Sequence, residues 1–353
     1  ITDRITSAVE QLGAEKTISY VARNISHPAV PPGEREGPDD DHVDRLQRIN
    51  AKTASVHRTI DPDFEYGHWS VFTETVPNIE VRIGAILSLE RIAQDSTIND
   101  KGRDHVRVME ILCAYLRENA PATDLNETPT PFETKKPRID IQAVINVIKR
   151  RGTDQQAIEE KQKYRLDLRM VNFDGCDLSK GPFRGAIFYF SRFEAANLSF
   201  ADLTGARLDG SLLNCANFLQ TVLHGTYAQI CTYSEGNMFS SLSRSDLRSI
   251  WIEGAKITNV HIDERKASSF FGSRDTILRE DLERYKREGL KIAERVESGD
   301  EDVEFDAADV AKDTPKAYLF RHWNPYTIDD GAAGIYRRRF IEKHGLHGWP
   351  FED

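Results

Sequence analysis

The side chains that most often do chemistry in proteins are thinly spread along this 353-residue chain. His344 and His347 are a lone pair in an expected loop, and two imidazoles do not complete a zinc site. His57 and His68 have no cysteine nearby and are interpreted as ordinary surface or core residues. Asp104 stands in an Arg-Asp-His sequence where a helix is expected to begin, so it is interpreted as an N-cap and not as a catalytic acid.

Motifs for catalysis are absent from the sequence. It contains no Walker loop, no nucleotide-binding glycine fingerprint and no His-Glu-x-x-His. The four cysteines form no Cys-x-x-Cys pair; Cys176 and Cys215 are expected at small inward positions of the repeat described next, with Cys231 in the same phase and Cys113 on a helix core face. We therefore expect reduced, buried thiols without disulfides, and no enzyme: no catalytic residue, no cofactor and no metal.

A large apolar residue recurs at every fifth position from Leu168 to Leu223, and a small residue mostly precedes it by two. A period of five is neither the 3.6 of a helix nor the 2 of a strand, so it requires a coil that turns a corner every five residues and stacks on copies of itself. The large residues are Leu168, Phe173, Leu178, Phe183, Phe188, Phe193, Leu198, Leu203, Leu208, Leu213, Phe218 and Leu223; the small ones are Cys176, Gly181, Ala186, Ser191, Ala196, Ala201, Ala206, Ser211, Ala216 and Thr221.

Packing explains the pattern. With four five-residue sides per turn, the large residue points to the axis, and its partner must be small because a second large group would overfill the lumen. Successive turns then pair like parallel strands, about 4.8 Å apart, which satisfies their backbone groups. The sequences Ala196-Asn197-Leu198-Ser199-Phe200 and Ala201-Asp202-Leu203-Thr204-Gly205 resemble the pentapeptide-repeat family, whose fold is a right-handed quadrilateral β-helix.

The register changes after Leu223. The old phase continues through Ala228, Tyr233 and Met238, and a new phase, one residue earlier, carries Leu242, Leu247, Ile252, Ile257 and Ile262. This shift predicts a one-residue deletion or a loop between about residues 224 and 241, with the solenoid continuing beyond it. The alternative is that the later stretch packs as ordinary strands.

Residues 1–163 are expected to form a helical N-terminal domain. It contains a turn-rich insertion at about 17–76, in which residues 52–76 suggest a hairpin turning near 61–63 or 66–67. The last helical segments, about 141–150 and 155–163, are expected to cap the open end of the first coil. The apolar stripes are Ile5, Val9 and Leu12; Val81, Ala85, Ile86, Leu89, Ile92 and Ala93; Met109, Leu112, Cys113 and Leu116; and Ile141, Val144, Ile145 and Ile148.

The helical sequences resemble those of bacterial, membrane-linked pentapeptide-repeat proteins. The similarity lies in residues 2–13, 81–93 and 108–118. In that subfamily two transmembrane helices usually precede the first helix, so the resemblance implies an anchor upstream of this chain. It places the protein on the cytoplasmic side of a bacterial inner membrane, with a cytoplasmic location as the alternative.

Residues 264–353 follow the expected solenoid of residues 164–263 and complete an α+β fold with a C-terminal helix and an aromatic tail. A charged helix is expected at about 275–296, followed by an acidic run at 297–313 with a net charge of −7. Eight aromatic residues then fall within residues 318–351, among which stand Arg337, Arg338 and Arg339. Such a segment is expected to dock on the solenoid or on another subunit.

Sorting the repeat into successive turns of four sides places outward side chains on common faces. One face carries Met170 and then Ile187, Tyr189 and Phe190, while Phe200 and Leu219 lie one coil apart on the opposite face. Exposed apolar clusters of this kind usually mark a contact, within the chain or with a partner. The candidate interaction surface is Met170, Ile187, Tyr189, Phe190, Phe200, Leu219, Trp323, Tyr326, Arg337, Arg338, Arg339, Phe340 and Trp349.

The charge distribution separates two functions. Some family members mimic DNA and inhibit gyrase, but residues 164–263 hold nine basic and ten acidic residues, a net charge of −1 against −10 for the chain. The sequence therefore favours a non-catalytic scaffold that recruits a protein partner or another subunit. No nucleic acid is expected, and a DNA-mimic regulator of a topoisomerase such as gyrase is the alternative.

Overall fold

The computed structural model describes residues 2–22, 25–26, 65–66, 70–122, 136–229, 232–234, 247–258, 270–278, several helical residues between 280 and 290, and 323–351 except 328 and 330–332. These form two compact units. One is Gly13–Arg82, and the other comprises Ile1–Leu12 and Ile83–Asp353. The expected acidic run at 297–313 lies outside the described residues, as do Cys231 and the residues near 61–63 and at 67.

The smaller unit is built on an antiparallel pair of strands. Strand β1 (Glu15–Ala22) pairs with β4 (Ser70–Pro77), and the two-residue strands β2 (Ile25–Ser26) and β3 (Glu65–Tyr66) pair beyond them. The hairpin expected within residues 52–76 is corrected here. The partner of β4 among the described residues is the distant β1, because alternation in a strand predicts the strand and not its neighbour.

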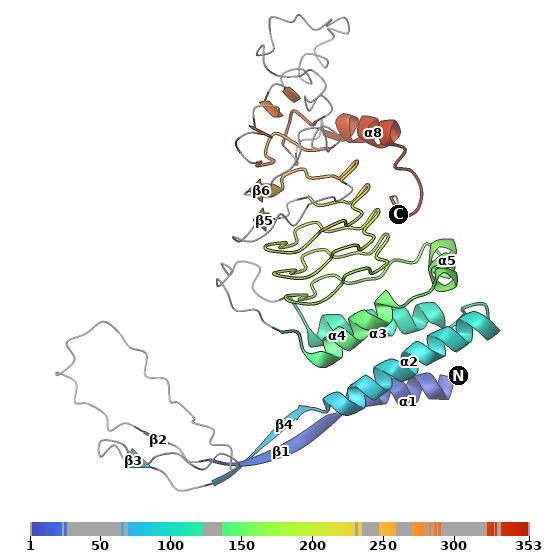
Figure 1. The fold of residues 1–353 in the computed structure, drawn as a ribbon, viewed down its shortest axis with the longest axis vertical. Coiled ribbons are helices and arrows are strands. Elements are labelled where there is room, and N and C mark those ends of the chain that lie inside the picture. The colour runs from blue at the N-terminus through green and yellow to red at the C-terminus, as the bar shows by residue number, and fades with distance from the viewer. Residues whose placement is uncertain are drawn as a thin grey trace, which may run out of the picture. The chain divides into compact units, whose positions relative to one another are not determined.

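In the described part of the chain, five helices precede the coil: α1 (Thr2–Leu12), α2 (Ile79–Asn99), α3 (His105–Asn119), α4 (Ile139–Lys149) and α5 (Thr153–Lys161) (Figure 1). The predicted apolar stripes of α3 and α4 are buried throughout. Two residues differ from their predicted faces: Val9 is 43% exposed and Val81 is 38% exposed. In α1 the buried residues are Ala8 and Leu12, which share a face because they are four residues apart.

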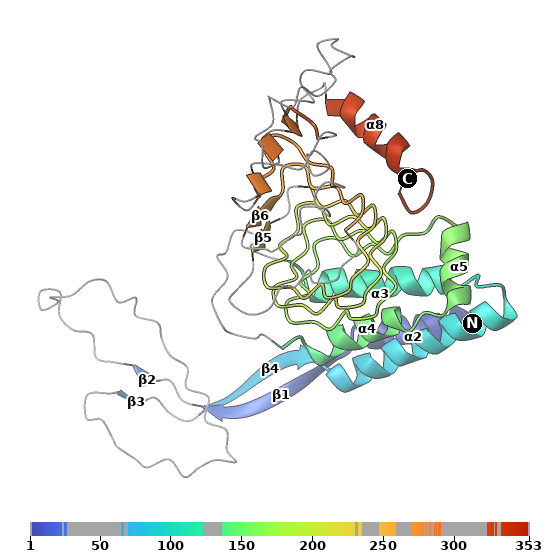
Figure 2. The same ribbon diagram turned by 45° about the horizontal axis from the view of Figure 1, so that its top comes forward.

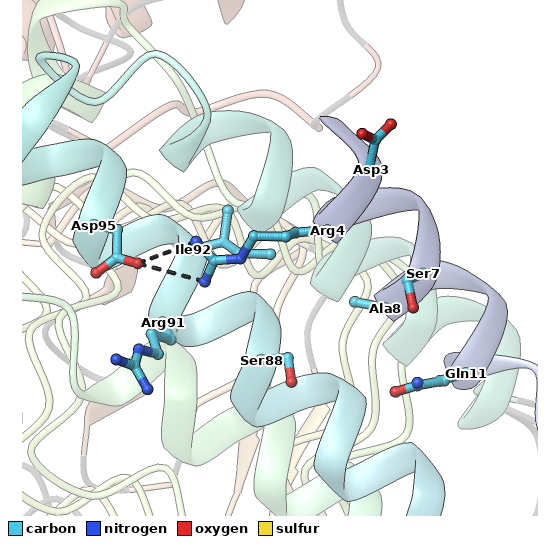
Figure 3. Close-up of a pocket in the computed structure, with 9 residues that line it drawn as sticks. All are labelled: Asp3, Arg4, Ser7, Ala8, Gln11, Ser88, Arg91, Ile92 and Asp95. Atoms are coloured by element: carbon cyan, nitrogen blue, oxygen red, sulfur yellow. Dashed lines mark hydrogen bonds and ion pairs between the residues drawn. The ribbon is translucent and has the colours of Figure 1, made fainter. Parts of the chain in front are cut away.

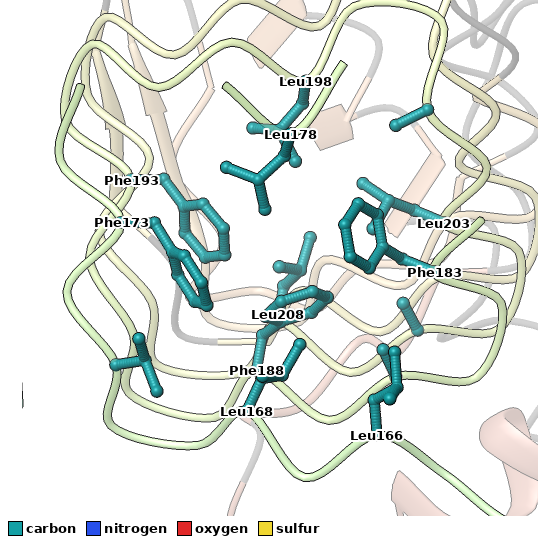
Figure 4. Close-up of a cluster of buried hydrophobic side chains, with 14 of the residues drawn as sticks. Leu166, Leu168, Phe173, Leu178, Phe183, Phe188, Phe193, Leu198, Leu203 and Leu208 are labelled. Carbon is teal, nitrogen blue, oxygen red and sulfur yellow. The ribbon is translucent and has the colours of Figure 1, made fainter. Parts of the chain in front are cut away.

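The solenoid consists of coils joined by parallel β-bridges between equivalent residues of successive turns, such as Asp167 to Ile187 and Ile187 to Arg207 (Figures 1 and 2). All twelve predicted large residues from Leu168 to Leu223 are at most 6% exposed, and their small partners are buried too. Figure 4 shows the large side chains from Leu168 to Leu208 pointing into the coil, where Phe173 stacks on Phe193 at a centroid distance of 5.0 Å. The inward pattern is therefore confirmed.

Each corner of the coil places one residue in the left-handed backbone region. Every fifth residue from Met170 to Gly225 has φ between 54° and 68°. Cys215 is one of them and is exposed, so its expected inward position is wrong: the small inward position is the next residue, Ala216. Burial raises the pKa of the Cys113 and Cys176 thiols to about 12, which keeps them protonated.

The solenoid continues beyond the register shift, as predicted. Tyr227 bridges Trp251, a longer step along the chain than the bridge from Arg207 to Tyr227 before it, and Trp251 then bridges Phe271 with the ordinary spacing. One coil is therefore four residues longer than the others. The pairing of β5 (Thr232–Ser234) with β6 (Lys256–Thr258) spans the same longer coil, and coil bridges extend past residue 263.

Two sides of the first coil are closed by α3 and the residues after it. The Arg117 guanidinium donates a hydrogen bond to the Asp167 carbonyl oxygen at 2.5 Å. On the next side, the Ala122 backbone N–H donates to the Met170 carbonyl at 2.7 Å, and the Asn172 backbone N–H donates to the Ala120 carbonyl at 2.8 Å. These groups replace the preceding coil that the first coil lacks.

The other two sides are closed by side chains at α4 and just after it. The Gln142 amide pairs with Asp177, accepting from its backbone N–H at 2.9 Å and donating to its carbonyl at 3.0 Å. Arg151 donates to the Pro182 carbonyl, and Pro182 has no N–H to satisfy. The predicted capping by the helix at residues 141–150 is confirmed at Gln142, whereas two of the sides are closed by α3 and residues 120–122, which were not predicted to cap the coil.

The last described coil is closed by residues before α8 (Ala333–His344). Asn324 bridges Ser273 in parallel, and its backbone N–H donates to the Gly272 carbonyl at 2.8 Å. The Trp323 indole N–H donates to the Phe270 carbonyl at 2.9 Å, and the ring is fully buried. Both ends of the described solenoid are therefore covered by other parts of the same chain.

The cap predicts a measurable stability effect at Gln142. The substitution Gln142→Leu removes both hydrogen bonds to the exposed Asp177 backbone, and we expect it to lower the free energy of unfolding by about 1 kcal/mol in urea denaturation. The matched control is Gln162→Leu, at an exposed position, which we expect to change stability by less than about 0.5 kcal/mol. Equal effects of the two substitutions would contradict the capping role.

Candidate interaction surface

Within residues 164–229 of the solenoid, three large apolar residues remain exposed: Met170 at 58%, Phe190 at 52% and Phe200 at 48%. Met170 and Phe190 occupy the same corner of successive coils, and the Phe190 ring lies over Gly210 of the next coil, where an added Cβ would be 2.5 Å from it. We call Met170 and Phe190 the apolar corner. Phe200 lies at the corner opposite, so the structure does not bring all three together.

The other predicted residues of the solenoid surface are half-buried. Ile187, Tyr189 and Leu219 lie on the sides between corners. Ile187 belongs to a column of bridged residues that continues through Arg207, Tyr227 and Trp251. Because these side chains stack along the solenoid, they stabilise it internally and leave less surface free than the corners do.

The aromatic tail docks on this column. The Trp251 ring stacks with Tyr227 at 5.2 Å and lies edge-on to Phe271 at 4.6 Å between centroids. Phe340 of α8 packs against Trp251 and Phe271 at 5.7 and 4.8 Å. Helix α8 therefore extends the aromatic column, and burial of these rings favours the docked state.

Two members of the predicted surface are buried by this docking within the chain. Trp323 is fully buried as the cap of the last coil, and Phe340 is only 2% exposed beneath α8. Aromatic composition predicts that such rings are buried in a contact but does not say which one, so neither belongs to an outward surface. Tyr326, Arg337 and Trp349 are half-buried, and Arg338 and Arg339 are exposed on α8.

A buried carboxylate holds α8 and the last cap on the solenoid. Glu253 is completely buried and accepts hydrogen bonds from four side chains. The donors are the Trp251 indole at 2.7 Å, the Gln229 amide at 2.9 Å, the Arg337 guanidinium at 2.8 Å and the Asn324 amide at 3.0 Å. A buried charge with this many donors is compensated, so the network specifies one docked arrangement.

The tail ends over a column of corner glycines. An added Cβ on Gly205 would be 2.7 Å from the Pro350 carbonyl oxygen, and one on Gly225 would be 2.5 Å from the Phe351 ring. The Tyr227 hydroxyl donates to the Phe351 carbonyl at 3.1 Å. The predicted docking of the tail on the solenoid thus occurs, but it leaves the apolar corner exposed.

A family comparison agrees with this coil. The model of the family described as pentapeptide repeats matches residues 191–227 in eight copies, within the coils that the regular parallel bridges join. Residues 191–227 are therefore pentapeptide repeats. The matched stretch includes both Phe200 and the glycine corners at 205 and 225, whereas the helices, the long coil and the tail lie outside it.

Three solved pentapeptide-repeat structures are similar over part of the chain. One from the cyanobacterium Cyanothece 51142 is 18% identical with a TM-score of 0.16, over 32% of this chain and 64% of that one. One from the Arabidopsis thaliana thylakoid lumen is 28% identical with a TM-score of 0.11, over 28% and 68%. HetL of Nostoc sp. Strain PCC 7120, involved in heterocyst differentiation regulation, is 20% identical with a TM-score of 0.12, over 31% and 58%.

This chain thus spans less than two thirds of the length of the first of these structures. A search of the curated proteins found no match.

The pentapeptide-repeat solenoid meets the helices at a buried polar cluster that sequence reasoning missed. The His105 imidazole contacts the Glu159 carboxylate at 2.7 Å, and Arg151 also donates to Glu159. Burial raises the pKa of Glu159, but the His105 hydrogen bond and the Arg151 charge outweigh it and lower the pKa overall. Because the cluster is buried and also holds the first coil, its role is structural.

Asp104 occupies the predicted N-cap position of α3, but its side chain makes no capping hydrogen bond. Its carboxylate instead contacts Arg103 at 3.3 Å and Arg107 at 3.8 Å. The prediction therefore holds for the position of Asp104 and not for its capping geometry.

A groove of about 670 Å³ lies between α1 and α2 (Figure 3). The ion pair between Arg4 and Asp95, at 3.4 Å, crosses it. Its other lining residues are Asp3, Ser7, Ala8, Gln11, Ser88, Arg91 and Ile92. This set lacks histidine and cysteine, so it offers no familiar nucleophile–base pair. Among the described residues no group of three or more metal-ligating side chains is found.

The docking of α8 predicts sensitivity to acid. His344 accepts or donates a hydrogen bond with the Ser249 hydroxyl at 2.8 Å, and Lys343 and His224 are its titratable neighbours. Burial and these neighbours lower the pKa of His344 below its ordinary value of 6.5. The unfolded or undocked state therefore binds a proton more readily, and docking weakens as the pH falls below about 6.5.

We expect the hydrogen-exchange protection of α8 to decrease between pH 7.5 and pH 5.5, after correction for intrinsic exchange rates. The variant His344→Gln removes the titrating group and should show a smaller dependence on pH. The control is His347→Gln, at an exposed position, which should retain the wild-type dependence. Identical pH profiles for the wild type and His344→Gln would contradict the assignment.

Proposed function

We propose that this protein is a non-catalytic interaction protein whose solenoid presents the apolar corner, Met170 and Phe190, to a protein partner. The observation that carries the proposal is their exposure next to a tail that covers a different corner. Full burial of a Met or Phe side chain contributes about 1.5–3 kcal/mol, so two such residues are a useful anchor for a partner.

Backbone strain supports the same assignment. Both residues have φ of 55°, a region in which a non-glycine residue costs about 1–2 kcal/mol. Gly210 fills the same corner one coil later, so the coil does not require a large side chain there. Large apolar residues at strained, exposed positions serve folding poorly, which favours a role in binding.

The finer assignments are part of the proposal. We propose a solenoid with the family's right-handed, four-sided winding, and a division into residues 1–163, 164–263 and 264–353. The resemblance of α1, α2 and α3 to membrane-linked relatives supports an upstream anchor and a location on the cytoplasmic side of a bacterial inner membrane. No helix among the described residues is long and apolar enough to cross a membrane.

The alternative of DNA mimicry has less support. Mimicry needs regular columns of acidic side chains, but the bridged column that begins with Asp177 continues as Asn197 and Asn217. Their amides form a ladder, with Asn197 donating to Asp177 at 3.3 Å and Asn217 to Asn197 at 3.2 Å. The column that begins at Asp167 continues with Ile187 and Arg207.

A double substitution tests the apolar corner without damaging the fold. In Met170→Gly/Phe190→Gly the backbone strain is relieved, so stability should not decrease by more than about 1 kcal/mol. We expect affinity purification of the full-length protein with quantitative mass spectrometry to lose its main protein partner. The matched control is Gln220→Gly, at an exposed corner with φ of 54°, which should retain the partner.

Unchanged partners and oligomeric state in the double variant would contradict the proposed surface. Inhibition of gyrase supercoiling by the wild-type protein, lost when acidic solenoid residues are reversed, would favour mimicry instead.

A further inference from the structure

The four corner columns of residues 170–225 differ in one respect. All have φ between 54° and 68°, but one column is glycine in all three coils: Gly185, Gly205 and Gly225. The other columns are Met170, Phe190 and Gly210; Gly175, Ala195 and Cys215; and Lys180, Phe200 and Gln220. Because residues as large as phenylalanine and lysine occupy this corner geometry, the coil itself does not require three glycines.

The requirement comes from a chain segment that lies against these corners. An added Cβ on Gly185 would lie 3.0 Å from Pro350, and one on Gly205 would lie 2.7 Å from the Pro350 carbonyl oxygen. At Gly225 it would lie 2.5 Å from Phe351 and 3.0 Å from Leu346. The three glycines therefore line a channel, which we call the glycine channel. It exists because these corners carry no side chains.

The tail segment in the glycine channel leaves one of its own polar groups without a hydrogen bond. The Trp349 indole N–H is buried without a hydrogen-bond partner among the described residues, although the Arg184 guanidinium lies 5.7 Å from the centroid of its ring. A buried donor without an acceptor costs about 1–3 kcal/mol. A segment of the same shape that also supplied an acceptor at this point would bind better.

We propose that the glycine channel is a peptide-binding site for a partner segment with a proline flanked by aromatic residues, and that residues 345–351 occupy it as an intramolecular competitor. The tail shows which side chains fit the channel. Pro350 lies against Gly185 and Gly205, and the Phe351 ring lies against Gly225 and 5.5 Å from the His224 ring, centroid to centroid. The site is separate from the apolar corner and does not rest on it.

The competition has a simple physical basis. The tail is tethered to the solenoid and therefore acts at a high effective concentration. A partner segment must bind the channel more tightly than the tail does, or bind while the tail is undocked. The His344 contact near the start of the tail makes the competitor weaker in acid, which ties access to the channel to pH.

The test uses the full chain with substitutions that weaken docking of its tail in the channel, here called the unseated variant. The variant Leu346→Ala/Phe351→Ala removes the two side chains that contact Gly225 and keeps the coil intact. The probe is a fluorescent peptide with the wild-type sequence of residues 343–353, followed by fluorescence anisotropy. We expect saturable binding to this variant at least about tenfold tighter than to the wild-type chain, whose own tail competes.

Two further substitutions locate the binding. Adding Gly205→Ala to the unseated variant places a Cβ in the channel and should weaken peptide binding by at least about tenfold. Adding Gly175→Ala imposes the same positive-φ strain at a corner outside the channel, where the next coil already carries Ala195, and should leave binding unchanged.

Binding that is absent from a folded unseated variant, or insensitive to Gly205→Ala, overturns the proposal. If the double variant does not fold by circular dichroism, Phe351→Ala alone, at a half-buried position, takes its place under the same criteria. Because Met170→Gly/Phe190→Gly leaves the channel untouched, normal peptide binding by that variant separates failure of the apolar corner from failure of the channel.

Discussion

Backbone hydrogen bonds between successive coils are the constraint on which this structure depends. Each side of a coil pairs with the equivalent sides of the coils before and after it, as in the bonds that join Asn197 to Cys176 and Leu198 to Asn217. A stack of such coils satisfies its own interior but leaves unpaired groups at both ends. In solution these ends would pair with other chains, so the solenoid is stable as a monomer only when each end is covered.

The chain solves this problem differently at its two ends. The first coil uses single side chains, Arg117, Gln142 and Arg151, for three sides and a short backbone segment for the fourth. The last described coil uses a buried indole and one further parallel bridge at Asn324. The buried carboxylates Glu159 and Glu253 lie beside these closures, and each fixes one arrangement because a misplaced partner would leave a charge uncompensated.

The sequence predicts what is periodic and misses what occurs once. The twelve inward residues follow from the five-residue repeat because packing imposes the same choice at every side. The extra loop was also predictable, since Leu247 and Ile252 repeat in a new phase. Gln142 and Arg151 were not, because a cap side chain occurs once and has no spacing to detect. Composition predicted that Trp323 would be buried in a contact but not that its contact is the end of the coil.

The glycine channel could have been predicted from the sequence by aligning the residues of successive coils. Gly185, Gly205 and Gly225 stand in register, and glycine repeated at one corner indicates that another chain segment approaches the backbone there. The apolar corner at Phe190 is the next corner along the same coil, so the side between Gly185 and Phe190, with half-buried Ile187 and Tyr189, joins the two surfaces. A partner that displaced the tail from the channel could also contact the apolar corner, which lies one side of the coil away. The exposed corner and the covered one are therefore separate but neighbouring corners of the same coils.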